Sequence, residues 1–341
     1  MIGTPFRAEE HRAIDVITSL GPCIIAKNDP PWSTLAPNIS NAVAVVDAWD
    51  MEFAALEEQC TGDNMQRACA DAEVVVGIGG GTALDTAKFL ASRLGLRLVQ
   101  IPTIASVDAA FTDAIGVREG GHVRYIDRIV PELVVIDIEL IRSAPPQLNR
   151  AGIGDILSCH TGLFDWSLAA VGGHGHSHRY DLEALGRRLL RDLDAAIAEI
   201  NNVTPVGIRF LLAAYREIGA ACAEAGHSRF EEGSEHFWAY AYEHATGSHH
   251  VHGELISFAV VAMSHVQGND PDWARDLVAR SGARVHPRDL SIDCDVFVDT
   301  LTNLRDYVRA EGLDYCIADA RTIERADAIA AYRFCETLPA G

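Results

Sequence analysis

The sequence lacks a long apolar run. None of its hydrophobic stretches approaches the roughly 18–20 consecutive apolar residues that a membrane-spanning helix needs. Its opening stretch, MIGTPFRAEEHRAIDVITSL, contains acidic residues and no apolar core, and therefore does not resemble a signal peptide. These two absences predict a cytoplasmic protein without a membrane partner.

Positive charge is also scarce. The 341 residues include 28 Lys and Arg against 48 Asp and Glu, which gives a formal net charge of −20. A chain this acidic repels the phosphate backbone of a nucleic acid, so nucleic-acid binding is not expected. The charge offers no general attraction for an anionic substrate either, and any phosphate would need donors placed locally.

Paired cysteines are absent as well. The eight cysteines are scattered and no CxxC pair occurs, which argues against a zinc knuckle and predicts reduced, mostly buried thiols. Histidines are numerous by contrast, and eleven of the fourteen lie between His160 and His265. Because imidazole binds metals and carries protons near neutral pH, the second half of the chain is where such chemistry is expected.

A chain of 341 residues is long for one hydrophobic core, which favours two domains. In the first part, short apolar runs alternate with helical patterns, and such alternation is typical of a parallel, doubly wound α/β sheet. The predicted strands are residues 23–26 and 42–46, both expected to be buried, and 73–80, 96–103 and 132–140, with a helix over 82–95.

The pattern changes near Pro145-Pro146. Two long amphipathic stretches, 181–200 and 208–226, predict helices, few strand-like runs follow, and residues 174–181 are expected to form a loop. The sequence therefore predicts an α/β dinucleotide-binding domain over residues 1–145 and an all-helical domain over residues 146–341.

A glycine run joins the third predicted strand to the following helix. Gly79, Gly80 and Gly81 allow a backbone to approach a diphosphate, and the helix N-terminus offers free N–H groups and a partial positive charge. The run matches neither the Walker A pattern nor GxGxxG, so a tight turn without a ligand is an equal alternative. Asp47 ends the strand at 42–46 and is either the acid that binds a ribose hydroxyl or a solvated carboxylate.

The segment Pro102–Ala110 leaves another strand at its carboxyl end, where doubly wound sheets bind ligands. Thr103 and Ser106 can donate to a phosphate or to the nicotinamide amide, and Asp108 can face a substrate. Alternatively, these three side chains form turns and helix caps.

A carboxylate and several histidines in the second half form a candidate metal site. Asp155 lies at the start of a predicted helix, and His236 and His252 are sixteen residues apart. One carboxylate and two imidazoles leave an open position, as catalytic Zn²⁺ or Fe²⁺ sites do. Spacing alone leaves the choice of histidines open, because these also occur nearby: His174, His176, His178, His244, His249 and His250. Asp155 is equally suited to be a helix N-cap.

Five motifs occur in an order that resembles the dehydroquinate synthase-like superfamily, which includes the iron-containing alcohol dehydrogenases. They are GGGTALDTAK, PTIASVDAA, the segment from Pro131 to Ser158, GSEH and HGE. Within this superfamily, PTIASVDA is similar to glycerol dehydrogenases, whereas GIGDILSCHTGLFDWSLA and GSEH are similar to glycerol-1-phosphate dehydrogenases. The resemblance is continuous over roughly residues 73–170 and restricted to motifs at 230–260.

The resemblance implies an N-terminal dinucleotide domain and a C-terminal helical domain. It implies NAD or NADP at the glycine run, where Asp85 and Lys88 shape the turn, and it places Thr103 and Ser106 near the cofactor and Asp108 near the substrate. It also implies one divalent metal, Zn²⁺ or alternatively Fe²⁺, on Asp155, His236 and His252. Relatives form dimers or rings, which predicts a homo-oligomer.

The expected activity is a metal-assisted hydride transfer between a small polyol, or its phosphate, and the nicotinamide. His244 is a candidate proton relay, and Arg118, His122 and Arg124 could hold a phosphate or lie on a solvated hairpin. Phosphate-dependent relatives carry His-Asp-Gly where this chain has Val107-Asp108-Ala109. Two alternatives remain, a sugar-phosphate cyclase that recycles NAD within one turnover and a non-catalytic binding protein.

Overall fold

The computed structural model describes residues 3–341 and divides the chain into two compact units. Unit 1 runs up to Asn149 and includes Tyr215–Glu224, and unit 2 comprises Arg150–Ala214 and Ala225–Gly341. This division differs from the predicted domain boundary at residue 145, because Tyr215–Glu224, ten residues of one long helix, belong to unit 1. Gly219 lies so close to the carbonyl oxygen of Phe111 that a Cβ atom there would be 1.8 Å away.

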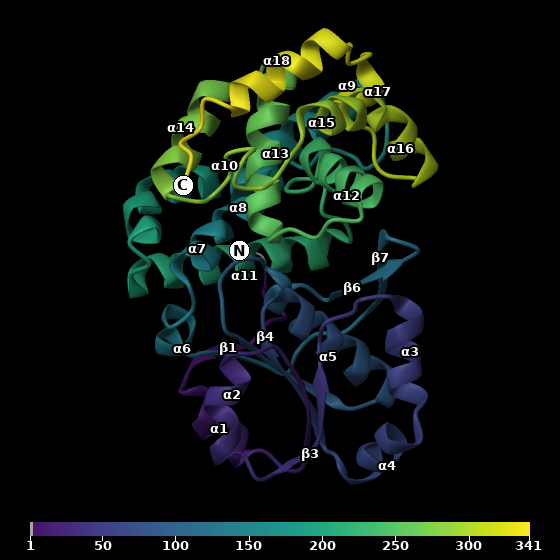
Figure 1. Ribbon diagram of the computed structural model, residues 1–341, viewed down its shortest axis with the longest axis vertical. Helices are drawn as coiled ribbons and strands as arrows, with labels where there is room; N and C mark the ends of the chain where they lie inside the picture. The colour runs from purple at the N-terminus through teal and green to yellow at the C-terminus, as the bar shows by residue number, and fades with distance from the viewer. Residues whose placement is uncertain (1–2) are drawn as a thin grey trace. The chain divides into compact units, whose positions relative to one another are not determined.

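Unit 1, in which Figure 1 labels β1, β3 and β4, is built on six parallel strands in the order β1-β8-β5-β4-β2-β3. They are β1 (Ala8–Glu10), β2 (Cys23–Lys27), β3 (Ala42–Asp47), β4 (Val74–Gly79), β5 (Arg97–Pro102) and β8 (Leu133–Ile136). A separate antiparallel hairpin is formed by β6 (Ala114–Glu119) and β7 (His122–Arg128). The predicted parallel α/β sheet is therefore confirmed.

Helices cover both faces of this sheet. The helices in this part of the chain are α1 (Ala13–Ser19), α2 (Pro31–Leu35), α3 (Phe53–Thr61), α4 (Asp63–Asp71), α5 (Gly81–Leu94), α6 (Ile138–Arg142) and α7 (Pro146–Arg150), and the 3-10 turns are η1 (Ala36–Asn38) and η2 (Ala109–Phe111). Successive residues of a strand point to opposite faces, so Ile24 packs with α3, α4 and α5, while Ile25 packs with α1 and α2. Burial on both faces explains the continuous apolar runs of β2 and β4.

Two strand predictions need correction. The run at 42–46 is not a buried strand, because β3 lies at the edge of the sheet and leaves Val43 and Val45 about two-fifths exposed, at 40% and 45%. The run at 132–140 is a strand only as far as Ile136. Asp137 then accepts a hydrogen bond from the Leu140 N–H group at 3.1 Å and caps helix α6. The hydrophobicity of the run alone does not reveal this change from strand to helix.

Unit 2 contains helices and no strand among its described residues, as predicted. The helices are α8 (Gly154–Leu157), α9 (Cys159–Gly172), α10 (Tyr180–Asn201), α11 (Pro205–Ala225, of which Tyr215–Glu224 belong to unit 1), α12 (Ser234–Thr246), α13 (His252–Gln267), α14 (Pro271–Ser281), α15 (Cys294–Thr302), α16 (Leu304–Ala310), α17 (Ile317–Ala320) and α18 (Arg325–Cys335), with the 3-10 turn η3 (Ala151–Ile153). Helix α13 is central and packs against α8, α12, α14 and α18. Over residues 3–341, no helix is both long enough and apolar enough to cross a membrane.

Candidate functional site

The glycine run forms the turn between β4 and α5 in unit 1. The Asn28 side chain accepts a hydrogen bond from the Gly80 N–H group at 3.3 Å and donates one to the Ala48 carbonyl at 2.8 Å. A Cβ atom on Gly79 would lie 2.5 Å from Asn28 Oδ1 and 2.7 Å from Ala83 Cβ, and the Gly79 φ is +157°. Glycine is favoured here, because any larger residue would overlap the Asn28 side chain and the Cβ atom of Ala83 on α5.

Asn28 is a residue that no pattern in the sequence singled out. Its neighbour Lys27 is buried and pairs with both Asp29 and Asp47. The carboxyl ends of β2 and β3 therefore present two carboxylates around one ammonium group. The Asp47 side chain is 56% exposed and so retains a face that a ligand can reach.

The segment after β5 lies over the glycine turn. The Thr103 N–H group donates to the Gly79 carbonyl at 3.0 Å, and Val107 Cγ1 is 3.1 Å from where a Cβ atom of Gly81 would be. Thr103 and Ser106 are both buried here, and Asp108 is half-buried at the start of η2. The structure thus brings the two predicted cofactor segments together within unit 1.

Residues beyond β5 are fixed by two side chains from distant parts of the sequence. Asn149 Oδ1 accepts from the Ala105 N–H group at 2.8 Å, and the Tyr215 hydroxyl donates to the Ala105 carbonyl at 3.0 Å. Asn149 also donates to the Ile141 carbonyl at 2.9 Å. These contacts hold the backbone that carries Thr103 and Ser106.

Asp85 and Lys88 lie on the first turns of α5. The Lys88 ammonium group is fully buried and donates to Asp85 Oδ1 at 2.9 Å, Thr112 Oγ1 at 2.7 Å and the Ala114 carbonyl at 3.0 Å. All three of its N–H groups are thereby used inside unit 1. The side chain therefore ties α5 to the start of β6.

Replacing Lys88 by methionine is expected to lower the free energy of unfolding by about 3 kcal/mol, because Asp85 and two other acceptors lose a buried cation. Denaturant titration followed by circular dichroism measures the change. Arg97→Met is the matched control, since the Arg97–Glu132 pair is exposed and its loss should cost no more than about 1 kcal/mol. Equal losses in the two variants would contradict the bracing role.

The candidate metal ligands Asp155, His236 and His252 come together in unit 2. One ligand atom from each lies within 4.8 Å of the others, and within residues 3–341 no second group of three such side chains meets this criterion. His252 Nε2 is 3.3 Å from Asp155 Oδ1. Tetrahedral Zn²⁺ with bonds of about 2.0–2.1 Å spaces its ligand atoms about 3.3 Å apart, so these residues fit a divalent cation.

Backbone packing explains how these ligands meet. A Cβ atom on Gly154 would be 2.7 Å from the Cα atom of Gly253, so α8 and α13 touch at two glycines. Each glycine is adjacent in the sequence to a candidate ligand, Asp155 or His252. The close approach therefore places a carboxylate from one helix beside an imidazole from the other.

His236 is held by its neighbour in the sequence. The fully buried Glu235 carboxylate is 2.9 Å from His236 Nδ1 and accepts from the Gly233 N–H group at 2.7 Å. Burial lowers the pKa of His236, but the hydrogen bond and charge of Glu235, with smaller contributions from Glu232 and Asp155, outweigh it and raise the pKa to about 9. The surroundings of this imidazole thus favour positive charge.

A second buried carboxylate, Asp165 on α9, fixes the start of α12. It accepts hydrogen bonds from the N–H groups of Ser234 and Ile317, both at 2.8 Å, and from the Gln267 side chain at 3.2 Å. Burial raises the pKa of Asp165 to about 6, even though the hydrogen bonds from Ser234 and the charge of Arg229 lower it. Neither Asp165 nor Glu235 was recognised from the sequence, although the GSEH motif contains Glu235.

The raised pKa of Asp165 has a consequence for stability. The folded chain binds this proton more tightly than the unfolded chain, so the contribution is complete below pH 3.8 and is lost as the pH rises through about 6. The difference corresponds to about 3 kcal/mol. In chelator-treated samples, we expect the free energy of unfolding of the wild-type chain, minus that of Asp165→Asn, to fall by most of this amount between pH 4 and pH 7. A difference that does not change with pH would contradict the prediction.

The remaining histidines lie elsewhere in unit 2. His244 is exposed near Tyr307, two turns and about 12 Å along α12 from His236, so its position lends no support to a proton relay. His174 stacks on Tyr315 and His176 on His227, whereas His250 contacts the Leu290 carbonyl. The structure thus separates the candidate ligands from the other histidines. In unit 1, Arg118, His122 and Arg124 lie on the β6–β7 hairpin.

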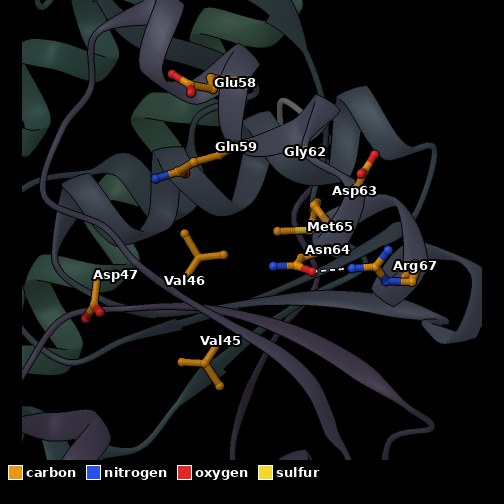
Figure 2. Close-up of a pocket in the computed structure, with 10 residues that line it drawn as sticks. All are labelled: Val45, Val46, Asp47, Glu58, Gln59, Gly62, Asp63, Asn64, Met65 and Arg67. Atoms are coloured by element: carbon orange, nitrogen blue, oxygen red, sulfur yellow. Dashed lines mark hydrogen bonds between the residues drawn. The ribbon is translucent and has the colours of Figure 1, made fainter.

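A groove of about 640 Å³ lies beside the exposed edge of β3 (Figure 2). Side chains of α3 and α4 line it, among them Glu58 and Met65, and Asp47 stands at one end (Figure 2). The glycine turn and the metal ligands do not contribute to its lining. It therefore touches the candidate cofactor site only through Asp47.

Comparison with known proteins identifies the family. Residues 35–145 match the family described as iron-containing alcohol dehydrogenase. The glycerol-1-phosphate dehydrogenase of Aeropyrum pernix, whose name specifies NAD(P)+, is 32% identical over 267 residues, which are 76% of this chain and 73% of that relative. The enzyme of the same name from Methanothermobacter thermautotrophicus is 29% identical over 70% of this chain and 69% of its own length.

A solved structure confirms the fold. The crystal structure of a probable glycerol dehydrogenase from Sinorhizobium meliloti 1021 superimposes with a TM-score of 0.74 at 20% identity, covering 99% of this chain and 98% of that one. The resemblance inferred from the five motifs is therefore confirmed. The chain belongs to the iron-containing alcohol dehydrogenase family and is an NAD(P)-dependent alcohol dehydrogenase.

Proposed function

We propose that this enzyme interconverts a small polyol or polyol phosphate with its ketone, and that Asp155, His236 and His252 hold the divalent cation that the reaction needs. The observation that carries the proposal is the convergence of these three side chains, whose ligand atoms lie within 4.8 Å of one another. They come from three separate helices, so their meeting is a property of the fold and not of one local motif.

A bound divalent cation supplies Lewis acidity, which lowers the pKa of a substrate hydroxyl and polarises the carbonyl that forms. Asp155 provides a negatively charged oxygen, and the two histidines provide neutral nitrogen ligands. Three protein ligands leave a coordination position for the substrate oxygen. Either Zn²⁺ or Fe²⁺ suits this donor set.

The residues that we propose to bind the cofactor belong to unit 1. We propose that the N–H groups at the start of α5 meet the cofactor diphosphate, since Gly80 at the N-cap position has no side chain to satisfy them. Asp47 would accept from a ribose hydroxyl, and Thr103 and Ser106 would donate toward the nicotinamide half. Asp108, which follows them, would face the substrate. A bound nicotinamide would supply the hydride chemistry, and these residues would orient it.

The names of the relatives make glycerol 1-phosphate the first substrate to test. Purified enzyme should be assayed for NADH and NADPH formation or consumption with glycerol, glycerol 1-phosphate, dihydroxyacetone and dihydroxyacetone phosphate. We expect turnover with at least one pair, loss of activity with a chelator, and recovery on adding Zn²⁺ or Fe²⁺. A sugar-phosphate cyclase would show no net change in NADH, and a binding protein would show no turnover in a metal-loaded sample.

Light scattering in solution tests the predicted homo-oligomer. We expect a mass of at least twice the 36.9 kDa of one chain, and a mass of 36.9 kDa would contradict the prediction.

A further inference from the structure

The carboxylate of Glu235 is buried beside a candidate metal ligand without enough partners of its own. The side chain is fully buried, and Oε1 contacts His236 Nδ1 at 2.9 Å and the Gly233 N–H group at 2.7 Å. Oε2 is also buried, and in residues 3–341 no group donates a hydrogen bond to it. Because burying a carboxylate is costly unless charge and hydrogen bonds compensate it, a positive charge beside Glu235 would be stabilising.

The contact with Glu235 determines which nitrogen of His236 is free. A carboxylate oxygen can only accept, so the proton of this hydrogen bond belongs to Nδ1. Nε2 is then the nitrogen whose lone pair can bind a cation. A metal-binding histidine is oriented in this way when a carboxylate holds its other ring nitrogen.

The charges of Asp155 and Glu235 together balance the charge of one divalent cation. A divalent cation bound by Asp155 leaves one net positive charge in a buried region, and the charge of Glu235 would neutralise it. Asp155 and His236 are buried, at 2% and 4% exposure, so water screens these charges little. The cation and Glu235 would lie on opposite sides of the same imidazole ring.

The backbone that carries Glu235 and His236 is itself fixed. The Ser234 N–H group donates to Asp165 Oδ2 at 2.8 Å, and the Gln267 side chain donates to both Asp165 Oδ2 and Ser234 Oγ at 3.2 Å. The start of α12 therefore has little freedom to rotate. His252 differs, because its side chain is 37% exposed and its ion-pair contact is with Asp155 itself.

From these contacts we propose that Glu235 is a positioning residue for the metal site. It holds the proton of His236 on Nδ1, aims Nε2 at the cation, and balances the charge of the bound ion. The inference rests on the metal site of the proposed function and adds a residue that acts through His236 without touching the ion.

The test measures the affinity of the purified chain for Zn²⁺ by competition with a chromophoric chelator. Glu235→Leu removes both the charge and the acceptor and should weaken Zn²⁺ binding about 10–100-fold. Glu235→Gln keeps an acceptor but loses the charge, and should weaken it less, by about 3–10-fold on the same scale. Glu336→Gln is the control, because it removes an equal charge from the exposed end of α18 in the same unit.

Two further measurements separate positioning from a purely structural role. The melting temperature of each metal-free variant reports on folding, and the visible absorption of the Co²⁺-loaded chain reports on the ligand geometry. Positioning predicts an altered Co²⁺ spectrum in Glu235→Gln that Glu336→Gln does not show. A lowered melting temperature with wild-type Zn²⁺ affinity and an unchanged Co²⁺ spectrum would overturn the proposal. If Glu235→Leu does not fold, the same comparison in Glu235→Gln decides the matter.

The outcome is independent of the substrate. Suppose that the wild-type chain binds one Zn²⁺, that His236→Ala does not bind it, and that the wild-type chain oxidises no polyol. This result would contradict the proposed function, whereas the Zn²⁺ affinities of the Glu235 variants would still test the role of Glu235. A wild-type chain that binds no divalent cation would overturn the role of Glu235 whatever its activity.

Discussion

Replacing Asp155 by alanine is expected to remove the divalent cation and to lower kcat/KM by about a thousandfold or more. Asp155 is the one anionic ligand of the proposed site, and its Oδ1 lies 3.3 Å from His252 Nε2. Lewis-acid stabilisation of a developing alkoxide is worth several kcal/mol, and each 1.36 kcal/mol corresponds to about tenfold in rate. Elemental analysis of the purified variant and an NADH absorbance assay measure the two effects.

His252→Ala should have the same effect, because it removes another of the three ligands. His249→Ala provides the matched control, since it deletes an exposed imidazole three residues away in the sequence. The control should keep its metal and its activity. If Asp155→Ala retained full turnover in a demonstrably metal-free sample, the metal-dependent reaction would have to be abandoned.

Replacing Gly79 by alanine is expected to cost both cofactor affinity and stability. The new Cβ atom would lie 2.5 Å from Asn28 Oδ1 and 2.7 Å from Ala83 Cβ. Relief of these overlaps must displace Asn28 or the start of α5, and overpacking of this kind costs about 1–3 kcal/mol. Because the same displacement moves the N–H groups proposed to bind the diphosphate, the Kd for NADH should rise at least about tenfold, the equivalent of 1.4 kcal/mol.

Gly62→Ala distinguishes this effect from a general cost of substituting glycine in unit 1. Gly62 lies between α3 and α4, and a methyl group at this position would have its nearest neighbour at an ordinary 3.4 Å. Titration of NADH fluorescence and thermal unfolding should both give wild-type values for this variant. Wild-type NADH affinity in Gly79→Ala would show that the turn does not bind the cofactor.

Much of unit 1 follows from local sequence. Residues 23–27 and 74–79 are apolar runs bounded by glycine, proline or charged residues, and the structure makes them the interior strands β2 and β4. Their burial on both faces needs no information beyond the run itself. Residues 42–47 show the limit of this reasoning, since an apolar run does not reveal whether a strand has one neighbour or two.

Contacts between segments that are distant in the sequence decided which side chains make up the candidate metal site. Asp155, His236 and His252 were three of many acidic and imidazole side chains, and only the contact of Gly154 with Gly253 makes neighbours of two of them. Family motifs had implied this set, while spacing had left six other histidines as candidates. The burial that makes Glu235 notable is likewise invisible in a sequence, because it depends on helices packed from elsewhere in unit 2.

The amino-acid sequence by itself determined a parallel α/β unit, a helical unit and an ordered set of motifs, because hydrophobic periodicity and glycine placement act over a few residues. Tertiary structure alone decided that Asn28 reaches the glycine turn, that residues 215–224 pack with unit 1, and that Glu235 accompanies His236 into the interior. The physical reason is that burial and hydrogen bonding between distant segments are fixed by packing, which no local pattern encodes.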